Sequence, residues 1–308
     1  MTDGRRYLDP KVLAKITRLD VRARLVVEGF ITGLHKSPYH GFAVEFATHR
    51  EYVPGDEIKH IDWKVWARQD RFYIKEYEEE TNLKCTIILD CSKSMDYGSN
   101  DDPVHHGMGK FEYAATAAAC LAFLLQHQQD AVGLVAFDND IRKNLPASSH
   151  PSHLKLILHE LEQIKPDKRS DIGDVFHRLA EQTRKRGMIV LVSDLFVDLD
   201  VLADAMRHFR HRRHEVVVLH TLHDHELTFP FQDNTMFRGL EVESEVLAEP
   251  RALRKSYLEV LENFTRRVRK LCADLGIDYV PMSTKDPLDA ALAGYLAFRQ
   301  RTMRKTRR

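Results

Sequence analysis

Short apolar runs alternate with amphipathic segments along most of the chain after residue 83. Continuous apolar runs such as 84–90 and 188–193 are typical of buried strands, and apolar residues at helical spacing between them are typical of helices packed on a sheet. Because parallel strands need crossover helices, this order predicts an α/β fold with a mostly parallel sheet and helices on both faces. We expect strands at 84–90, 131–137, 141–145, 188–193, 215–221 and 277–281, helices at 110–127, 151–164, 171–184, 199–212, 250–274 and 286–298, and a β-leaning insertion at 226–246.

The pattern is different before residue 83. Residues 10–33 hold apolar positions at helical spacing, whereas residues 42–77 hold short aromatic or alternating runs broken by Pro54, Gly55 and Asp56. We therefore expect three parts: a helical and β-rich extension at 1–82, the main α/β domain at 83–300, and a disordered basic tail at 301–308.

Composition narrows the choice of partner and compartment. Lys and Arg number 46, as do Asp and Glu, so the neutral balance gives no overall preference for nucleic acid or an anionic membrane. Four cysteines without a C-x-x-C pair indicate a reducing compartment. The apolar run 114–125 is too short to span a bilayer, and the N-terminus lacks the apolar core of a secretory signal. We expect a cytoplasmic protein without a membrane segment.

A cluster of oxygen donors follows the strand at 84–90. Asp90, Ser92 and Ser94 form a D-x-S-x-S pattern where the strand ends, and Asp194 ends the strand at 188–193 in the same way. If these strands are neighbours in one parallel sheet, both carboxylates share its C-terminal edge, where open α/β sheets bind ligands. The segment 169–174 starts a further helix and brings Ser170 to the same point.

Such a cluster suits Mg²⁺, which prefers octahedral oxygen ligands and keeps several waters, although Mn²⁺ or Ca²⁺ also accepts oxygen ligands. The expected metal ligands are Asp90, Ser92, Ser94, Ser170 and Asp194. The alternative is that Asp90 and the serines only cap the helix that follows.

The three motifs together resemble those of a known site. D-x-S-x-S at residues 90–94, S-D-I-G at 170–173 and V-S-D at 192–194 resemble the metal-ion-dependent adhesion site of von Willebrand factor A domains. Ser170 stands where that family usually has Thr, which keeps the hydroxyl. The resemblance implies a von Willebrand A-like, Rossmann-like sheet for the main domain.

A second block sharpens the resemblance. Residues 50–63 read REYVPGDEIKHIDW and are followed by Ala67-Arg68 and by YIKEYEEE at 73–80. The block resembles the signature of the prokaryotic domain-of-unknown-function family 58, whose members carry a von Willebrand A-like domain and are associated with MoxR-type AAA+ ATPases. The resemblance covers about residues 30–300. The charged and aromatic residues of this block (Asp56, Asp62, Trp63 and Arg68) are expected to be structural.

The resemblance implies a non-enzymatic, metal-ion-dependent protein-binding module. In adhesion-type A domains a partner's Asp or Glu completes the coordination of the metal, and the same is expected here. The implied partners are a MoxR-type AAA+ ATPase and a protein client, with no small-molecule substrate.

Three other functions are weighed against this one. Haloacid-dehalogenase-like phosphohydrolases also present an Asp at a strand tip with Mg²⁺ nearby, but they need a second Asp where this chain has Ser92. Residues 107–111 contain a Gly-Lys pair without the other P-loop residues, so any ATP hydrolysis is expected to come from a partner. The basic run 299–308 offers nucleic-acid binding as a further alternative, although such tails are more often solvated. Histidines 208, 211, 214, 220, 223 and 225 crowd one segment, in which His223, Asp224 and His225 could hold a transition metal. The six histidines are expected to point in different directions, which favours solvated or hydrogen-bonded side chains over a metal site.

Overall fold

The chain divides into two compact units, 1–33 with 83–308, and 34–82. In the smaller unit, β1 (His49–Glu51) pairs antiparallel with β2 (Tyr73–Lys75). The N-terminal helix and the β-rich segment, predicted together as one extension at 1–82, thus fall into different units. The computed structural model describes residues 13, 16, 18–35, 49–51, 72–75, 83–98, 107–169, 172–182, 186–241 and 244–288.

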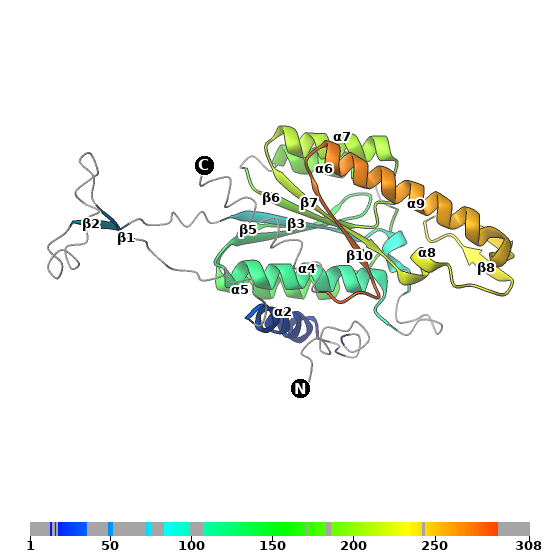
Figure 1. Ribbon diagram of the computed structural model, residues 1–308, viewed down its shortest axis with the longest axis horizontal. Helices are drawn as coiled ribbons and strands as arrows, with labels where there is room; N and C mark the ends of the chain where they lie inside the picture. Colours follow the sequence, from blue (N-terminus) through cyan, green and yellow to red (C-terminus); the bar gives the residue numbers. More distant parts are fainter. Residues whose placement is uncertain are drawn as a thin grey trace. The chain divides into compact units, whose positions relative to one another are not determined.

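A six-stranded sheet forms the centre of the larger unit as far as the structure describes it, in the order β10-β7-β6-β3-β4-β5 (Figure 1). Neighbouring strands are parallel except β5, which pairs antiparallel with β4 at one edge. The predicted mostly parallel α/β sheet is therefore confirmed. The strands are β3 (Lys84–Asp90), β4 (Ala131–Phe137), β5 (Ile141–Ser148), β6 (Met188–Ser193), β7 (Glu215–Leu222) and β10 (Asp278–Ser283).

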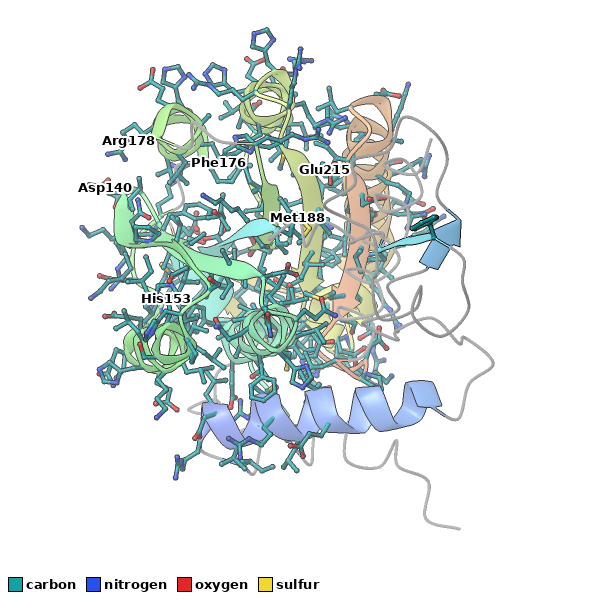
Figure 2. All side chains as sticks on the ribbon, turned by 90° about the vertical axis from the view of Figure 1, so that its left-hand side faces the viewer. Asp140, His153, Phe176, Arg178, Met188 and Glu215 are labelled. Carbon is teal, nitrogen blue, oxygen red and sulfur yellow. The ribbon has the colours of Figure 1, made fainter. Side chains whose placement is uncertain are left out.

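Helices cover both faces of this sheet. On one face lie α4 (Lys110–His127) and α5 (Pro151–Gln163), and on the other lie α6 (Ile172–Gln182), α7 (Leu199–His211) and α9 (Pro250–Asp274), as Figures 1 and 2 show. Between β7 and α9 the chain forms the short helix α8 (Asp224–Thr228) and a hairpin of β8 (Thr235–Arg238) and β9 (Glu245–Ala248). Strands at a sheet's centre need cover on both faces, which explains their unbroken apolar sequences.

Aromatic packing fixes α6 and α7 to the sheet. The ring of Phe176 lies edge-on to Phe137 of β4 at 5.5 Å and to Phe209 of α7 at 5.3 Å between centroids. Figure 2 shows Phe176 on the inner side of α6, while Arg178 of the same helix forms a 2.7 Å ion pair with Asp140 at the periphery. The 3.6-residue period of the sequence thus separates a core side from a solvent side of α6.

The helix α2 (Leu19–His35) is fastened to α4 and α5 by charged groups and crosses them (Figure 2). The buried guanidinium of Arg22 lies 2.7 Å from Glu112 Oε1 and donates to Thr116 Oγ1 at 3.1 Å. The backbone amide of Leu19 donates to Glu162 Oε1 at 3.1 Å. Residues from the start of the chain therefore form part of the layer below α4.

All four cysteines (85, 91, 120 and 272) are buried and unbridged, and burial raises the pKa of each thiol. Within the described part of the chain, no helix combines the length and the apolar character that a membrane crossing requires. The predicted helix at 286–298 lies outside the described residues except for its first three positions, and the basic tail at 301–308 lies wholly outside them.

Candidate functional site

The carboxyl ends of β3 and β6 form the point where the chain changes direction across the sheet. After β3 the chain enters α4 on one face and returns as β4, and after β6 it enters α7 on the opposite face and returns as β7. Ligands of open α/β sheets bind at such a switch point. Because Leu89 lies opposite Val192, Asp90 is beside Ser193 and one residue from Asp194 along the edge. The two aspartates therefore share one edge, as the sequence predicts.

Asp90 is buried and receives hydrogen bonds from two neutral donors. Its Oδ1 accepts from the backbone amide of Ser92 at 2.9 Å, and its Oδ2 accepts from Ser193 Oγ at 2.6 Å. The hydroxyls of Ser92 and Ser94 lie 3.1 Å apart. Ser92 precedes the 3-10 helix η3 (Lys93–Asp96) without capping it through its side chain. Its hydroxyl is thus directed to Ser94 rather than to a helix end.

The loop before Ser170 runs alongside the D-x-S-x-S loop. The amide of Lys93 donates to the carbonyl of Lys168 at 2.7 Å, and the amide of Asp167 donates to the carbonyl of Cys91 at 3.2 Å. Ser170 itself lies outside the described residues. The backbone nonetheless brings residues 167–168 against the first loop, two positions before the predicted ligand.

Asp194 is buried and held at both carboxylate oxygens. Oδ2 lies 2.8 Å from Lys110 Nζ, and Oδ1 accepts from the backbone amide of Phe196 at 3.3 Å. The carbonyl of Asp194 accepts from His220 Nε2 at 2.8 Å, and His220 Nδ1 lies 2.7 Å from Tyr279 Oη. The next residue, Leu195, has a φ of +56°, an uncommon conformation for a branched side chain. These contacts fix the tip of β6.

Lys110, a residue that sequence reasoning missed, supplies the positive charge of this region. Its side chain is 0% exposed, and Nζ lies 2.8 Å from both Asp194 Oδ2 and Glu226 Oε1. Burial lowers the pKa of Lys110, but the carboxylates of Asp194 and Glu226 raise it by more, so the group is an ammonium at neutral pH. The position offered a signal: lysine is unfavourable in the first turn of a helix, where the helix dipole prefers acids.

The carboxylates of Asp90 and Asp194 carry like charges and repel each other. Burial, followed by the charge of Asp194, raises the pKa of Asp90 to about 7 against the hydrogen bonds from Ser193 and Ser92. Burial also raises the pKa of Glu226, an effect that Lys110 partly offsets. His220 is neutral because burial lowers its pKa to about 4, which agrees with its donating Nε2 to a carbonyl. A cation between Asp90 and Asp194 would relieve their repulsion.

The donors fit a hard dication. No group of three or more His, Cys, Asp or Glu side chains that could hold a metal is found among the described residues. Asp90, Ser92, Ser94 and Asp194 instead offer carboxylate and hydroxyl oxygens, the set that Mg²⁺, Mn²⁺ and Ca²⁺ accept. Asp90 has no cationic partner in the part of the chain that the structure describes, so its charge is open to a metal ion.

Ser193 and Glu226 were also missed as site residues. Ser193 precedes Asp194 and bonds to Asp90 across the strand pair, whereas Glu226 is 116 residues from Lys110 in the sequence. Among the crowded histidines, His220 supports Asp194 and His223 caps α8 by accepting from the amide of His225 at 3.1 Å. These two have separate structural roles.

Comparisons with solved structures and curated proteins give distant relatives. Uncharacterized proteins of Mycobacterium tuberculosis and Mycobacterium bovis are 24% identical over 300 residues, which cover 95% of this chain and 91% of each relative. The conserved hypothetical protein BatB from Bacteroides thetaiotaomicron is 17% identical with a TM-score of 0.45, over 68% of this chain and 94% of that one. An aerotolerance-related membrane protein from Bacteroides fragilis is 17% identical with a TM-score of 0.45, over 70% and 96%.

The family described as "Protein of unknown function DUF58" matches residues 48–266, which is more than half of the chain and includes every predicted metal ligand. This chain therefore belongs to the DUF58 family.

Proposed function

We propose that the larger unit is a von Willebrand A-like domain that binds proteins through a divalent metal ion. Asp90, Ser92 and Ser94 would be direct ligands, and Ser170 and Asp194 would complete the set directly or through water. One observation carries this proposal: Asp90 lies beside Ser193 and Asp194 at the tips of neighbouring strands. The paired hydroxyls of Ser92 and Ser94 lie in the loop that follows Asp90. A dication held there supplies an electrophilic position for an anionic oxygen.

The charge balance supports a partner carboxylate as that oxygen. Asp194 already shares its charge with Lys110, so Asp90 is the carboxylate left to neutralise a dication. The remaining positive charge favours a further acidic group. An Asp or Glu of a protein client fits this requirement, and the resemblance to the MoxR-associated family proposes an AAA+ ATPase as the motor that the protein would connect to its client.

Phosphohydrolysis is less well supported. A phosphatase of this type needs an acid/base group two positions after the nucleophile, where Ser92 stands. Lys110, which pairs with Asp194, is fully buried between Asp194 and Glu226 and does not face a substrate. Nucleic-acid binding through the tail at 301–308 gains no support, because that segment lies outside the described residues.

The test is Asp90→Ala against Asp204→Ala, a control at an exposed position of α7. Asp90→Ala is expected to keep its circular dichroism spectrum but to lose the rise in melting temperature that Mg²⁺ gives the wild type. It should also lose EDTA-sensitive capture of the MoxR-type ATPase or of a client from the same organism. The control should retain both. If Asp90→Ala retains both, the proposal is wrong.

A further inference from the structure

The ammonium of Lys110 is enclosed on three sides. Nζ lies 2.8 Å from Asp194 Oδ2, 2.8 Å from Glu226 Oε1 and 5.0 Å from the centre of the Phe196 ring. A buried lysine is costly unless its charge is paired, and here two carboxylates and an aromatic face replace water. The charged ammonium is therefore stabilised inside the protein, beside the predicted metal ligand Asp194.

Both ends of this residue are anchored. The backbone amide of Lys110 donates to the carbonyl of Tyr97 at 3.0 Å, which ties the start of α4 to the end of the loop that carries Ser92 and Ser94. Glu226, the second partner of the ammonium, accepts through Oε2 from the amide of His223 at 2.7 Å. The backbone of Lys110 and the carboxylate of Glu226 are therefore both held in place around the ammonium.

The two aspartates consequently present different charges to an incoming ion. Asp90 receives its hydrogen bonds from an amide and a hydroxyl, which are neutral. Asp194 is already paired with an ammonium at Oδ2, and its Oδ1 accepts from the amide of Phe196. A second cation on the same carboxylate would be repelled by the first.

We propose that Lys110 is a positioning residue that acts as a built-in cation and keeps Asp194 from binding the divalent ion directly. Asp194 then acts through a water molecule, and a coordination position stays available for the partner's acidic group. The inference rests on the proposed metal-dependent function and deepens it. Without Lys110, Asp194 would bind the ion, neutralise it and occupy that position.

The test compares the wild type with Lys110→Met/Glu226→Gln, which removes both charges of one ion pair and leaves no unpaired buried carboxylate at position 226. Glu226→Gln alone is the matched control, because it keeps the pair of Lys110 with Asp194. The probe is Mn²⁺, whose affinity is measured by electron paramagnetic resonance and whose coordinated waters are counted by water-proton relaxation. Circular dichroism checks the fold, and Lys110→Gln/Glu226→Gln replaces the double variant if that variant does not fold.

Compared with Glu226→Gln, from which it differs only by the loss of the positive charge of Lys110, the double variant is expected to bind Mn²⁺ about tenfold more tightly and to retain fewer waters on the ion. Glu226→Gln should retain as many waters on the ion as the wild type, because Lys110 still pairs with Asp194. Equal or weaker binding with an unchanged water count, while the wild type binds Mn²⁺ in an Asp90-dependent manner, overturns the role of Lys110 and leaves the proposed function standing. If the double variant binds Mn²⁺ and the wild type does not, the role of Lys110 as a built-in cation is supported. If neither protein binds Mn²⁺, both the role of Lys110 and the proposed metal-dependent function are overturned.

Discussion

The carboxyl group of Asp90 makes the stability of the protein depend on pH. Its pKa is about 7 in the folded state, above the ordinary value of 3.8, because of burial and the charge of Asp194. Between these pH values the folded state holds a proton that the unfolded state has lost. The contribution of this group to stability therefore falls as the pH rises from about 4 to about 7.

Asp90→Asn, which cannot ionise, should lack this dependence. In EDTA, the free energy of unfolding of the variant relative to the wild type is expected to rise with pH over this window, by at most about 1.4 kcal/mol per pH unit. Urea titrations at pH 4.5, 6 and 8 would measure the difference. Mg²⁺ should reduce it by stabilising the ionised wild type. Parallel pH profiles of the two proteins would contradict the shifted pKa of Asp90.

For single residues, the sequence predicted the two site carboxylates, Asp90 and Asp194, but not the ammonium of Lys110. Asp90 and Asp194 each end a run of apolar strand residues, so their common edge followed from local pattern and sheet geometry. Lys110 and Glu226 are 84 and 116 residues away from their partners, and their pairing depends on how α4 and α8 pack on the sheet. The lysine in the first turn of α4 is a local signal, but no local pattern encodes its partners, and the preceding glycine suggested an incomplete P-loop.

Gly98 links two elements near the site. It has a φ of +71°, and a Cβ at this position would lie 2.6 Å from Nε2 of His223, the residue that caps α8. Gly98→Ala should therefore destabilise the protein by about 1–3 kcal/mol, through both backbone strain and displacement of the cap.

Chemical denaturation of Gly98→Ala and Gly107→Ala would measure this effect. A Cβ at Gly107 meets nothing within 4 Å, so the second variant should match the wild type. Hydrogen exchange at α8 should accelerate only in the first variant. Equal stability of the two variants would show that the approach of His223 to Gly98 is unimportant.

Elements with long, regular patterns were predicted well. The helices at 110–127 and 250–274 and the strands at 84–90, 131–137 and 188–193 have the bounds that periodicity predicts. The helix α8 was missed, and it overlaps the start of the segment at 226–246 that was expected to lean towards β structure. It spans five residues and depends on a capping box of His223 and Glu226, and histidine is not among the usual capping residues.

At the scale of the whole molecule, Arg22 connects the start of the chain to the central sheet through α4. Its guanidinium is buried, pairs with Glu112 and donates to Thr116 and to the carbonyl of Ile16. Arg22→Met should lower the free energy of unfolding by about 2 kcal/mol, because Glu112 and Ile16 lose a charged donor.

The control is Arg24→Met, at an exposed position of the same helix. Urea denaturation should distinguish the two variants, and limited proteolysis should cut near α2 sooner in Arg22→Met. If both variants are as stable as the wild type, α2 is not held by this ion pair.

The parallel sheet could be predicted as a whole because strands and helices alternate, but the grouping of the N-terminal helix could not. Residues 1–33 belong with 83–308, although 34–82 separate them in the sequence. That association depends on Arg22 meeting Glu112 and on Leu19 meeting Glu162, contacts between residues 90 or more positions apart. The amphipathic pattern of α2 predicts a buried face without indicating what covers it.

The inaccessible cysteines simplify spectroscopy on this protein. Since the four thiols are buried and their pKa values are raised, a maleimide fluorophore should not react with them in the native state. A cysteine introduced at the exposed position Glu259 on α9 would then be the single labelled residue, and the four natural cysteines would not have to be replaced first.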